Sequence, residues 1–126
     1  MELTVDFAST VPIYTQIRNA VIRAIADGHL KPSEALPSVR ALGSALGVNY
    51  HTVNKAYTQL ADEGFITMRR GLGAMVAEQL PAVDPHFEQE VVPQMKALFT
   101  EAKVRTVDRQ ALVALIDQVY NEGRHS

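Results

Sequence analysis

A segment near the middle of the chain is rich in side chains whose hydrogen-bonding groups suit nucleic acid. Its residues are Asn49, Tyr50, His51, Thr52, Val53, Asn54 and Lys55. Amide, hydroxyl and imidazole groups can read base edges, and the free N–H groups at a helix start can hold a phosphate. The plainer alternative is a capped helix with a solvated face, because polar residues are the norm on protein surfaces.

Two short helices are predicted to position this segment. Ser38 can cap a helix over 38–46 that ends at Gly47, and Asn49 can cap a second helix that ends near Gly64. Their apolar positions are Val39, Leu42, Leu46, Val53, Tyr57 and Leu60. Gly47 supplies the tolerance for positive φ that a turn between two closely packed helices needs. The pattern predicts a helix-turn-helix, whose second helix enters the DNA major groove by its N-terminal end.

A β-hairpin is predicted directly after these helices. Two short apolar-rich segments, 65–68 and 74–77, flank a tip that reads Arg69-Arg70-Gly71-Leu72-Gly73. A helix-turn-helix followed by a hairpin is a winged helix, whose wing can lie along a DNA groove.

The residues before the helix-turn-helix predict one strand and one helix. Alternating apolar residues favour a short strand over 2–7. Ser9 or Thr10 can cap a helix that opens near Pro12 and stops at Gly28. Its apolar stripe recurs every four residues, at Ile13, Ile17, Val21 and Ile25.

The C-terminal part is predicted to be helical, so the fold class is mainly α with a small β-hairpin. Pro93 predicts a kink or break in a helix over 86–103, and Thr106 can cap a last helix with Asp108 in its first turn. One side of that helix is lined by Leu112, Leu115, Ile116 and Val119. We therefore expect a winged helix over 1–77, a linker over 78–85 and a helical part over 86–126.

Composition excludes several classes of protein. The chain has 126 residues and no cysteine, so disulfides and thiolate metal sites are excluded. There is no apolar run of about 18 residues and no basic, apolar secretory signal, so we expect a cytoplasmic protein without a membrane partner.

The net charge of −2 argues mildly against a nucleic-acid partner, but the charge is unevenly distributed. Residues 1–77 carry 7 Lys and Arg against 6 Asp and Glu, a balance of +1. Residues 78–126 carry 5 against 8, a balance of −3. The first part can therefore still offer phosphates a locally positive surface.

Nothing in the sequence predicts an enzyme, a cofactor or a metal. The four histidines, His29, His51, His86 and His125, are scattered. Asp84, His86 and Glu88 are close in sequence, but a solvated helix start explains them better, because metal sites need several converging ligands. No phosphate-binding loop, dinucleotide fingerprint or nucleophile elbow is present.

Five blocks between residues 10 and 77 together resemble the DNA-binding domain of the GntR family of bacterial transcription regulators. They are PIYTQI (12–17), LPSVRAL (36–42), LGVNYHTVNKAY (46–57), the Asp-Glu-Gly-Phe-Ile run (62–66) and GLGAMV (71–76). The short tail resembles the subgroup with only a small dimerising C-terminal part.

The resemblance implies roles for single residues. Arg40 matches an arginine that contacts DNA, where a guanidinium suits guanine or phosphate, and Thr52 matches a phosphate contact. Tyr50 departs from the family, which usually has arginine there and so reads guanine. The expected DNA-binding set is Arg40, Asn49, Tyr50, His51, Thr52, Asn54, Lys55, Arg69, Arg70, Gly71 and Gly73. These residues also have plainer alternatives. Arg40 could be a solvated helix charge, and the wing arginines could be a plain exposed hairpin end. Tyr50 and His51 could be exposed first-turn residues, and Lys55 a nonspecific phosphate contact or a solvated charge.

The resemblance implies a repressor that binds an inverted-repeat operator as a homodimer through its C-terminal helices, with release by a small-molecule effector of unknown identity. One alternative is a winged helix used for protein contact, which the near-neutral charge allows. A second is the first part of a regulator–aminotransferase fusion, although residues 78–126 contain no cofactor-lysine domain.

Overall fold

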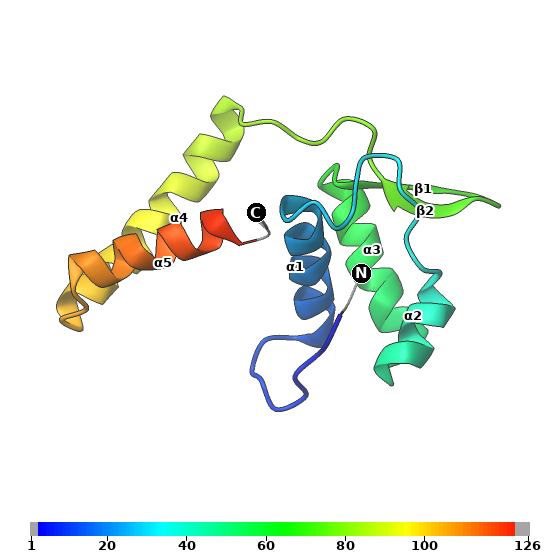
Figure 1. Ribbon diagram of the computed structural model, residues 1–126, viewed down its shortest axis with the longest axis horizontal. Helices are drawn as coiled ribbons and strands as arrows, with labels where there is room; N and C mark the ends of the chain where they lie inside the picture. The colour runs from blue at the N-terminus through cyan, green and yellow to red at the C-terminus, as the bar shows by residue number, and fades with distance from the viewer. Residues whose placement is uncertain (1–2, 123–126) are drawn as a thin grey trace. The chain divides into compact units, whose positions relative to one another are not determined.

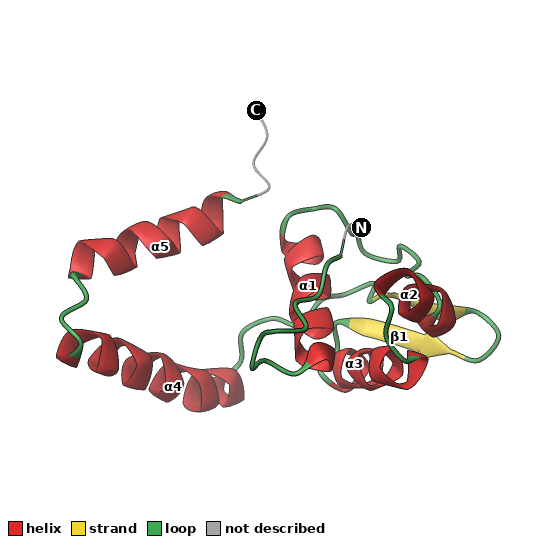
Figure 2. Ribbon diagram, turned by 90° about the horizontal axis from the view of Figure 1, so that it is seen from below, coloured by secondary structure: helices red, strands yellow, loops and turns green. Residues whose placement is uncertain are grey.

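The computed structural model describes residues 3–122, and the chain divides into two compact units, 1–81 and 82–126. The fold is mostly helical with one small sheet, as predicted (Figures 1 and 2). The elements are α1 (Ile13–Ala26), α2 (Val39–Leu46), α3 (Tyr50–Asp62), β1 (Ile66–Arg69), β2 (Gly73–Val76), α4 (Pro85–Val104) and α5 (Arg109–Asn121).

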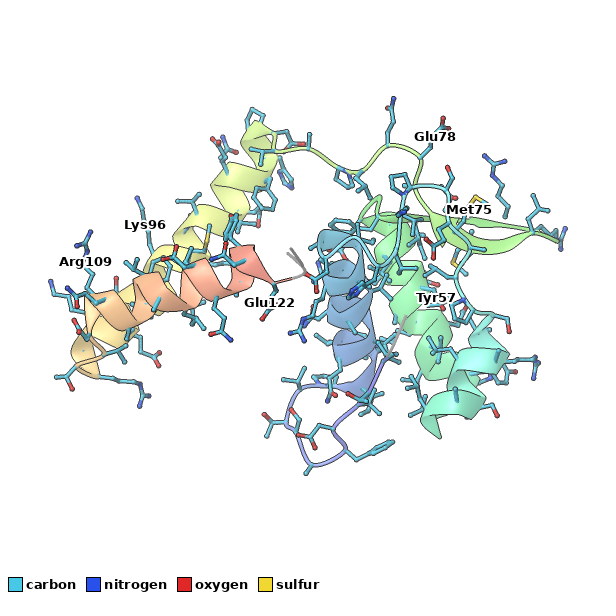
Figure 3. All side chains as sticks on the ribbon, in the orientation of Figure 1. Tyr57, Met75, Glu78, Lys96, Arg109 and Glu122 are labelled. Atoms are coloured by element: carbon cyan, nitrogen blue, oxygen red, sulfur yellow. The ribbon has the colours of Figure 1, made fainter. Side chains whose placement is uncertain are left out.

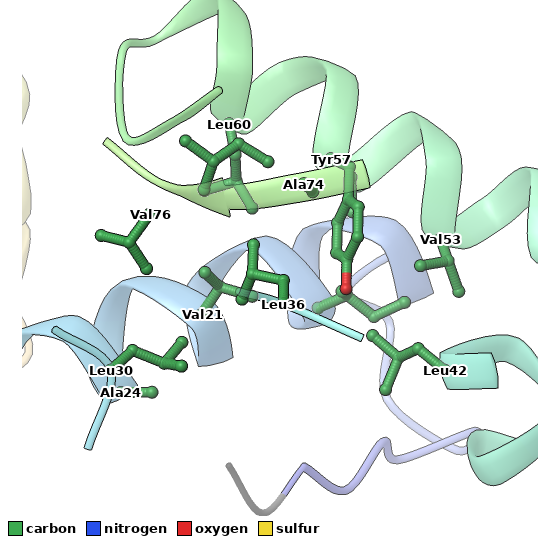
Figure 4. Packing of buried hydrophobic residues seen from close by; sticks show 13 residues of the cluster. Val21, Ala24, Leu30, Leu36, Leu42, Val53, Tyr57, Leu60, Ala74 and Val76 are labelled. Carbon is green, nitrogen blue, oxygen red and sulfur yellow. The ribbon is translucent and has the colours of Figure 1, made fainter. Parts of the chain in front are cut away.

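The helix α3 is the centre of the first unit, because it packs against α1, α2 and β1. Its apolar residues recur at the spacing of one helix face, and all of them are buried: Val53, Ala56, Tyr57 and Leu60. From α1, Ile17 and Val21 complete this core, together with side chains from the loops and β2 (Figure 4). The predicted stripe of α3 is therefore buried, as are Ile17 and Val21 of the α1 stripe, and the other two residues of that stripe, Ile13 and Ile25, are half-buried against the core.

The predicted helix-turn-helix is present, and its caps are the predicted residues. The Ser38 hydroxyl accepts a hydrogen bond from the N–H of Ala41 at 3.0 Å, and the Asn49 side chain accepts one from the N–H of His51 at 2.9 Å. Between them Gly47 ends α2 in the left-handed region at φ 72°. Local capping rules therefore fix where both helices begin and where α2 ends.

The wing is an antiparallel hairpin in which Ile66 pairs with Val76 and Arg69 pairs with Gly73. The connector before α2 adds to the same sheet. The N–H of Leu36 donates to the carbonyl of Ala74 at 2.9 Å, and the N–H of Val76 donates to the carbonyl of Glu34 at 2.9 Å. The strand β2 is thus held on both sides.

The predicted strand over 2–7 is wrong for its described residues, 3–7. The side chain of Gln16 instead holds this segment as a loop, since it accepts from the N–H of Asp6 at 2.8 Å and donates to the carbonyls of Asp6 and Val11. Neither Ser9 nor Thr10 caps α1, which begins after Pro12 without a side-chain cap.

In the second unit, α4 runs through Pro93 without a break, and Asp84 caps it by accepting from the N–H of Phe87 at 2.8 Å. Thr106 is not the cap of α5. It adopts φ 60° and helps to end α4, while Asp108 caps α5. The N–H of Val107 donates to the carbonyl of Ala102, which closes the turn. None of the described residues of this unit is buried.

Candidate nucleic-acid interface

The face of α3 opposite the core carries four exposed polar residues at helical spacing: His51, Asn54, Lys55 and Thr58. Three of these belong to the predicted set, and the sequence prediction missed Thr58. The signal that could have found it is the helix period, since Thr58 lies four residues after Asn54 and three after Lys55. These four residues therefore form a polar stripe on the exposed face of α3, whose opposite face is anchored in the core.

Arg40 and Tyr50 come together across the turn between α2 and α3. The Cζ atom of Arg40 lies 4.1 Å from the centroid of the Tyr50 ring, which is cation–π geometry. The Tyr50 ring also lies 4.1 Å from the His51 ring, with the ring planes inclined by 34°. Three predicted site residues thus form one group at the start of α3.

Lys55 also rests on an aromatic ring. Its Nζ atom lies 4.0 Å from the centroid of the ring of Tyr14, a residue of α1. The ammonium group is exposed at its outer side, because Lys55 as a whole is exposed. This contact couples the polar face of α3 to α1.

Asn49 and Thr52 have backbone roles that limit what their side chains can do. The Asn49 side-chain oxygen is occupied by the N–H of His51, so its amide N–H groups remain for a ligand. Thr52 is half-buried, and its N–H donates to the carbonyl of Asn49 at 2.9 Å. The N–H groups of His51 and Thr52 are therefore already engaged by Asn49, and the positive end of the α3 dipole is what this turn offers an anion.

Two residues outside the predicted set fix the angle between α2 and α3. The hydroxyl of Tyr57 donates to the carbonyl of Pro37 at 2.8 Å (Figure 3 labels Tyr57 on α3). A Cβ added to Gly43 would lie 2.9 Å from the carbonyl oxygen of Val48, so the turn passes close to α2 only because Gly43 has no side chain. A close approach of this kind has no local sequence signal.

The wing presents its predicted residues at an exposed tip. Gly71 and Gly73 have φ values of 83° and 77°, a region that favours glycine. Arg69, Arg70 and Leu72 are all exposed. A groove of about 320 Å³ lies between the wing and the helices, with Asn54, Arg69 and Arg70 among its lining residues. The fold therefore brings the wing arginines to the same groove as the polar face of α3.

The electrostatics of these segments favour an anionic partner. Residues 35–61 and 64–77 contain four cations, Arg40, Lys55, Arg69 and Arg70, and no Asp or Glu. The acids near α3 are at its C-terminal end: Asp62 is its last residue, and Glu63 forms a two-pronged salt bridge with Arg18 at 3.0 and 2.9 Å. The acidic charge of the first unit is thus separate from the start of α3.

Among residues 3–122, no three His, Asp or Glu side chains lie close enough to hold a metal ion. None of the helices in that part is both long and apolar enough to cross a membrane.

Comparisons with known proteins agree with this geometry. The family model described as bacterial regulatory proteins, gntR family, matches residues 13–76. The HTH-type transcriptional repressor YtrA of Bacillus subtilis is 31% identical over 118 residues, which are 93% of this chain and 91% of that protein.

Two solved structures extend the comparison to three dimensions. A transcriptional antiterminator from Listeria monocytogenes EGD-e matches with a TM-score of 0.88 and 25% identity, over 100% of this chain and 98% of that chain. The DNA-binding domain of AraR in complex with operator ORX1 matches with a TM-score of 0.55 and 26% identity, over 61% of this chain and 96% of that chain. The part of this chain that the match covers therefore has the fold of a domain that binds operator DNA in AraR.

Proposed function

The chain belongs to the GntR family of bacterial regulatory proteins, and on that premise we propose that it is a transcription repressor that binds an inverted-repeat operator as a homodimer. Its relatives regulate transcription, and the Bacillus subtilis relative is a repressor. The observation that carries the proposal is the polar stripe of α3, whose N-terminal turn also gathers Arg40.

The start of α3 would enter the major groove. Asn54 suits adenine, because an amide can both donate to and accept from the adenine edge, and the Arg40 guanidinium suits guanine. Lys55 and the positive end of the α3 dipole suit phosphates. Arg69 and Arg70 would follow the DNA backbone beside the wing, so much of the affinity would depend on salt concentration.

The second unit is proposed to join two copies of the chain. Its described residues include large apolar side chains that are strongly exposed: Leu98 67%, Val104 78%, Leu115 55% and Val119 57%. An isolated pair of helices with no buried residue is not expected to be stable in water, because tertiary packing supplies most helical stability. A second copy is the partner that the symmetry of an inverted repeat requires.

Repression would follow from occupancy of a promoter in the cytoplasm. Release by an effector has one structural support, a pocket of about 570 Å³ between α4 and α5. Its walls are mainly apolar, and Lys103 and Arg109 add positive charge. A ligand bound there would change the pairing of two second units, and through it the spacing of the two α3 helices on DNA.

Selection of binders from a random duplex pool tests the proposal. We expect the full chain to enrich an inverted repeat, and we expect Arg40→Ala to enrich nothing or a degenerate site. Arg23→Ala is the matched control, because Arg23 is an exposed arginine at the end of α1 outside the groups described above. If the wild-type chain enriches no sequence, the winged helix serves another purpose, such as protein contact.

A further inference from the structure

The contact between Arg40 and Tyr50 has a property that a salt bridge lacks. A cation over a ring uses the flat face of the guanidinium, so the N–H donors in its plane stay free. Within residues 3–122, no hydrogen bond or salt bridge engages those donors. Arg18 shows the contrast, because the carboxylate of Glu63 occupies two of its nitrogen atoms.

The ring of Tyr50 is itself held in place. Tyr50 is the first residue of α3 and is half-buried, and its Cα lies beside α2, 3.2 Å from where a Cβ of Gly43 would be. The His51 ring packs against it at 4.1 Å. Arg40 is exposed, so without the ring its side chain would sample many rotamers in solvent. Contact with a fixed ring restricts these rotamers.

We propose that Tyr50 is a positioning residue, whose ring orients the Arg40 guanidinium so that its free donors meet one base pair of the operator. This inference rests on the proposed DNA-binding function and deepens it. An arginine at position 50 would add a second guanine reader, and it would also place a like charge beside Arg40. A tyrosine at this position cannot read guanine in that way, and its ring instead orients Arg40, the remaining guanine reader. The specificity at this end of the half-site should then depend on a pair of residues rather than on either alone.

The experiment is a double-mutant cycle on the full chain, read out base pair by base pair. The selected operator is altered at each position in turn, and equilibrium affinities are measured for wild type, Arg40→Ala, Tyr50→Ala and both together. The Arg40 base pair is the one whose alteration no longer matters in Arg40→Ala. Tyr50→Phe is the matched control, because it keeps the ring and loses only the hydroxyl.

We expect Tyr50→Ala to reduce discrimination at the Arg40 base pair by about two- to fivefold, the range of an exposed cation–π contact. Discrimination at the other base pairs should be unchanged in Tyr50→Ala, and Tyr50→Phe should discriminate as wild type does. In the Arg40→Ala background, Tyr50→Ala should cause no further loss of discrimination. Thermal unfolding of each variant separates this loss from a general loss of fold, which would lower discrimination at every position.

Two results would overturn the inference while leaving the proposed function intact. In one, the effects of Arg40→Ala and Tyr50→Ala add fully, so that Tyr50 contacts DNA on its own account. In the other, Tyr50→Phe loses as much as Tyr50→Ala, so that the hydroxyl and not the ring matters. Failure of the wild-type chain to prefer any sequence would instead overturn the proposed function.

Discussion

The hydroxyl of Tyr57 in α3 donates a 2.8 Å hydrogen bond to the backbone carbonyl of Pro37, which precedes α2. The Tyr57 side chain is only 1% exposed, and its burial raises the pKa of the hydroxyl from 10.0 to about 12. The bond ties α3 to the start of the helix-turn-helix from inside the core. Its loss should therefore affect stability first and DNA binding only through the angle between the helices.

Replacement of this hydroxyl gives the first prediction. Tyr57→Phe should lower the free energy of unfolding by about 1 kcal/mol, because one hydrogen bond is lost and the Pro37 carbonyl is left without its partner. Denaturant unfolding at neutral pH measures the change. Tyr120→Phe is the control, since Tyr120 is 77% exposed and should give no change.

The raised pKa of Tyr57 gives the second prediction. The fold favours the protonated hydroxyl, so the contribution of Tyr57 to stability is complete below pH 10 and is lost as the pH rises through about 12. The difference in unfolding free energy between wild type and Tyr57→Phe should shrink over this interval. A difference that stays constant or grows would show that the hydroxyl is not buried in its neutral form.

Ser33 gives the third prediction, because it has φ 68°, a conformation that suits glycine, and its N–H donates to the carbonyl of Val76. Ser33→Gly should keep that bond and remove the strain. The expected gain is roughly 0.5–1 kcal/mol, after the larger chain entropy of glycine is allowed for. Thermal unfolding should show a rise of a few degrees, whereas Ser33→Ala should show none. A lower melting temperature for Ser33→Gly would contradict this account of the turn.

The fourth prediction concerns the closest approach within the helix-turn-helix. Gly43→Ala should lower the free energy of unfolding by about 1–3 kcal/mol, because its Cβ would lie 2.9 Å from the carbonyl oxygen of Val48. Alanine is the better helix former by about 1 kcal/mol, so a loss would show that the tertiary contact dominates. Ser44→Ala, at the exposed neighbouring position, should leave stability nearly unchanged.

The fifth prediction addresses the pairing of two chains through the second unit. Leu115→Glu should convert dimers to monomers, because it places a charge among exposed apolar residues of α5. Operator affinity should fall with it, since the two half-sites are then bound separately. Analytical ultracentrifugation measures the assembly. Gln110→Glu is the control, because it adds the same charge elsewhere on α5 and should leave the protein dimeric. A wild-type chain that is monomeric would contradict the proposed interface.

The elements of the helix-turn-helix could be predicted because their signals are local. Ser38 and Asn49 are cap residues, Gly47 accepts positive φ, and the apolar spacing of α3 marks its buried face. One expectation that failed depends on contacts with a later segment. Residues 3–7 form a loop because the side chain of Gln16 bonds Asp6 and Val11, and the alternation of apolar residues over 2–7 carries no signal of this contact.

Competition between neighbouring residues explains the wrong cap of α5. Thr106 and Asp108 can both cap a helix, and the left-handed conformation that Thr106 adopts is one that its branched side chain disfavours. Two features of the candidate site could not be predicted from the sequence. The contact of Arg40 with Tyr50 and the role of Gly43 arise only when two helices meet.

The most direct test of the account is the affinity ratio between the selected operator and a scrambled duplex of the same length and composition, measured at physiological salt. For wild type we expect a ratio of about a thousandfold or more, as sequence-specific binding requires, and for Arg40→Ala a much smaller ratio. Equal affinity of the wild-type chain for the two duplexes would contradict the claim that the start of α3 reads sequence.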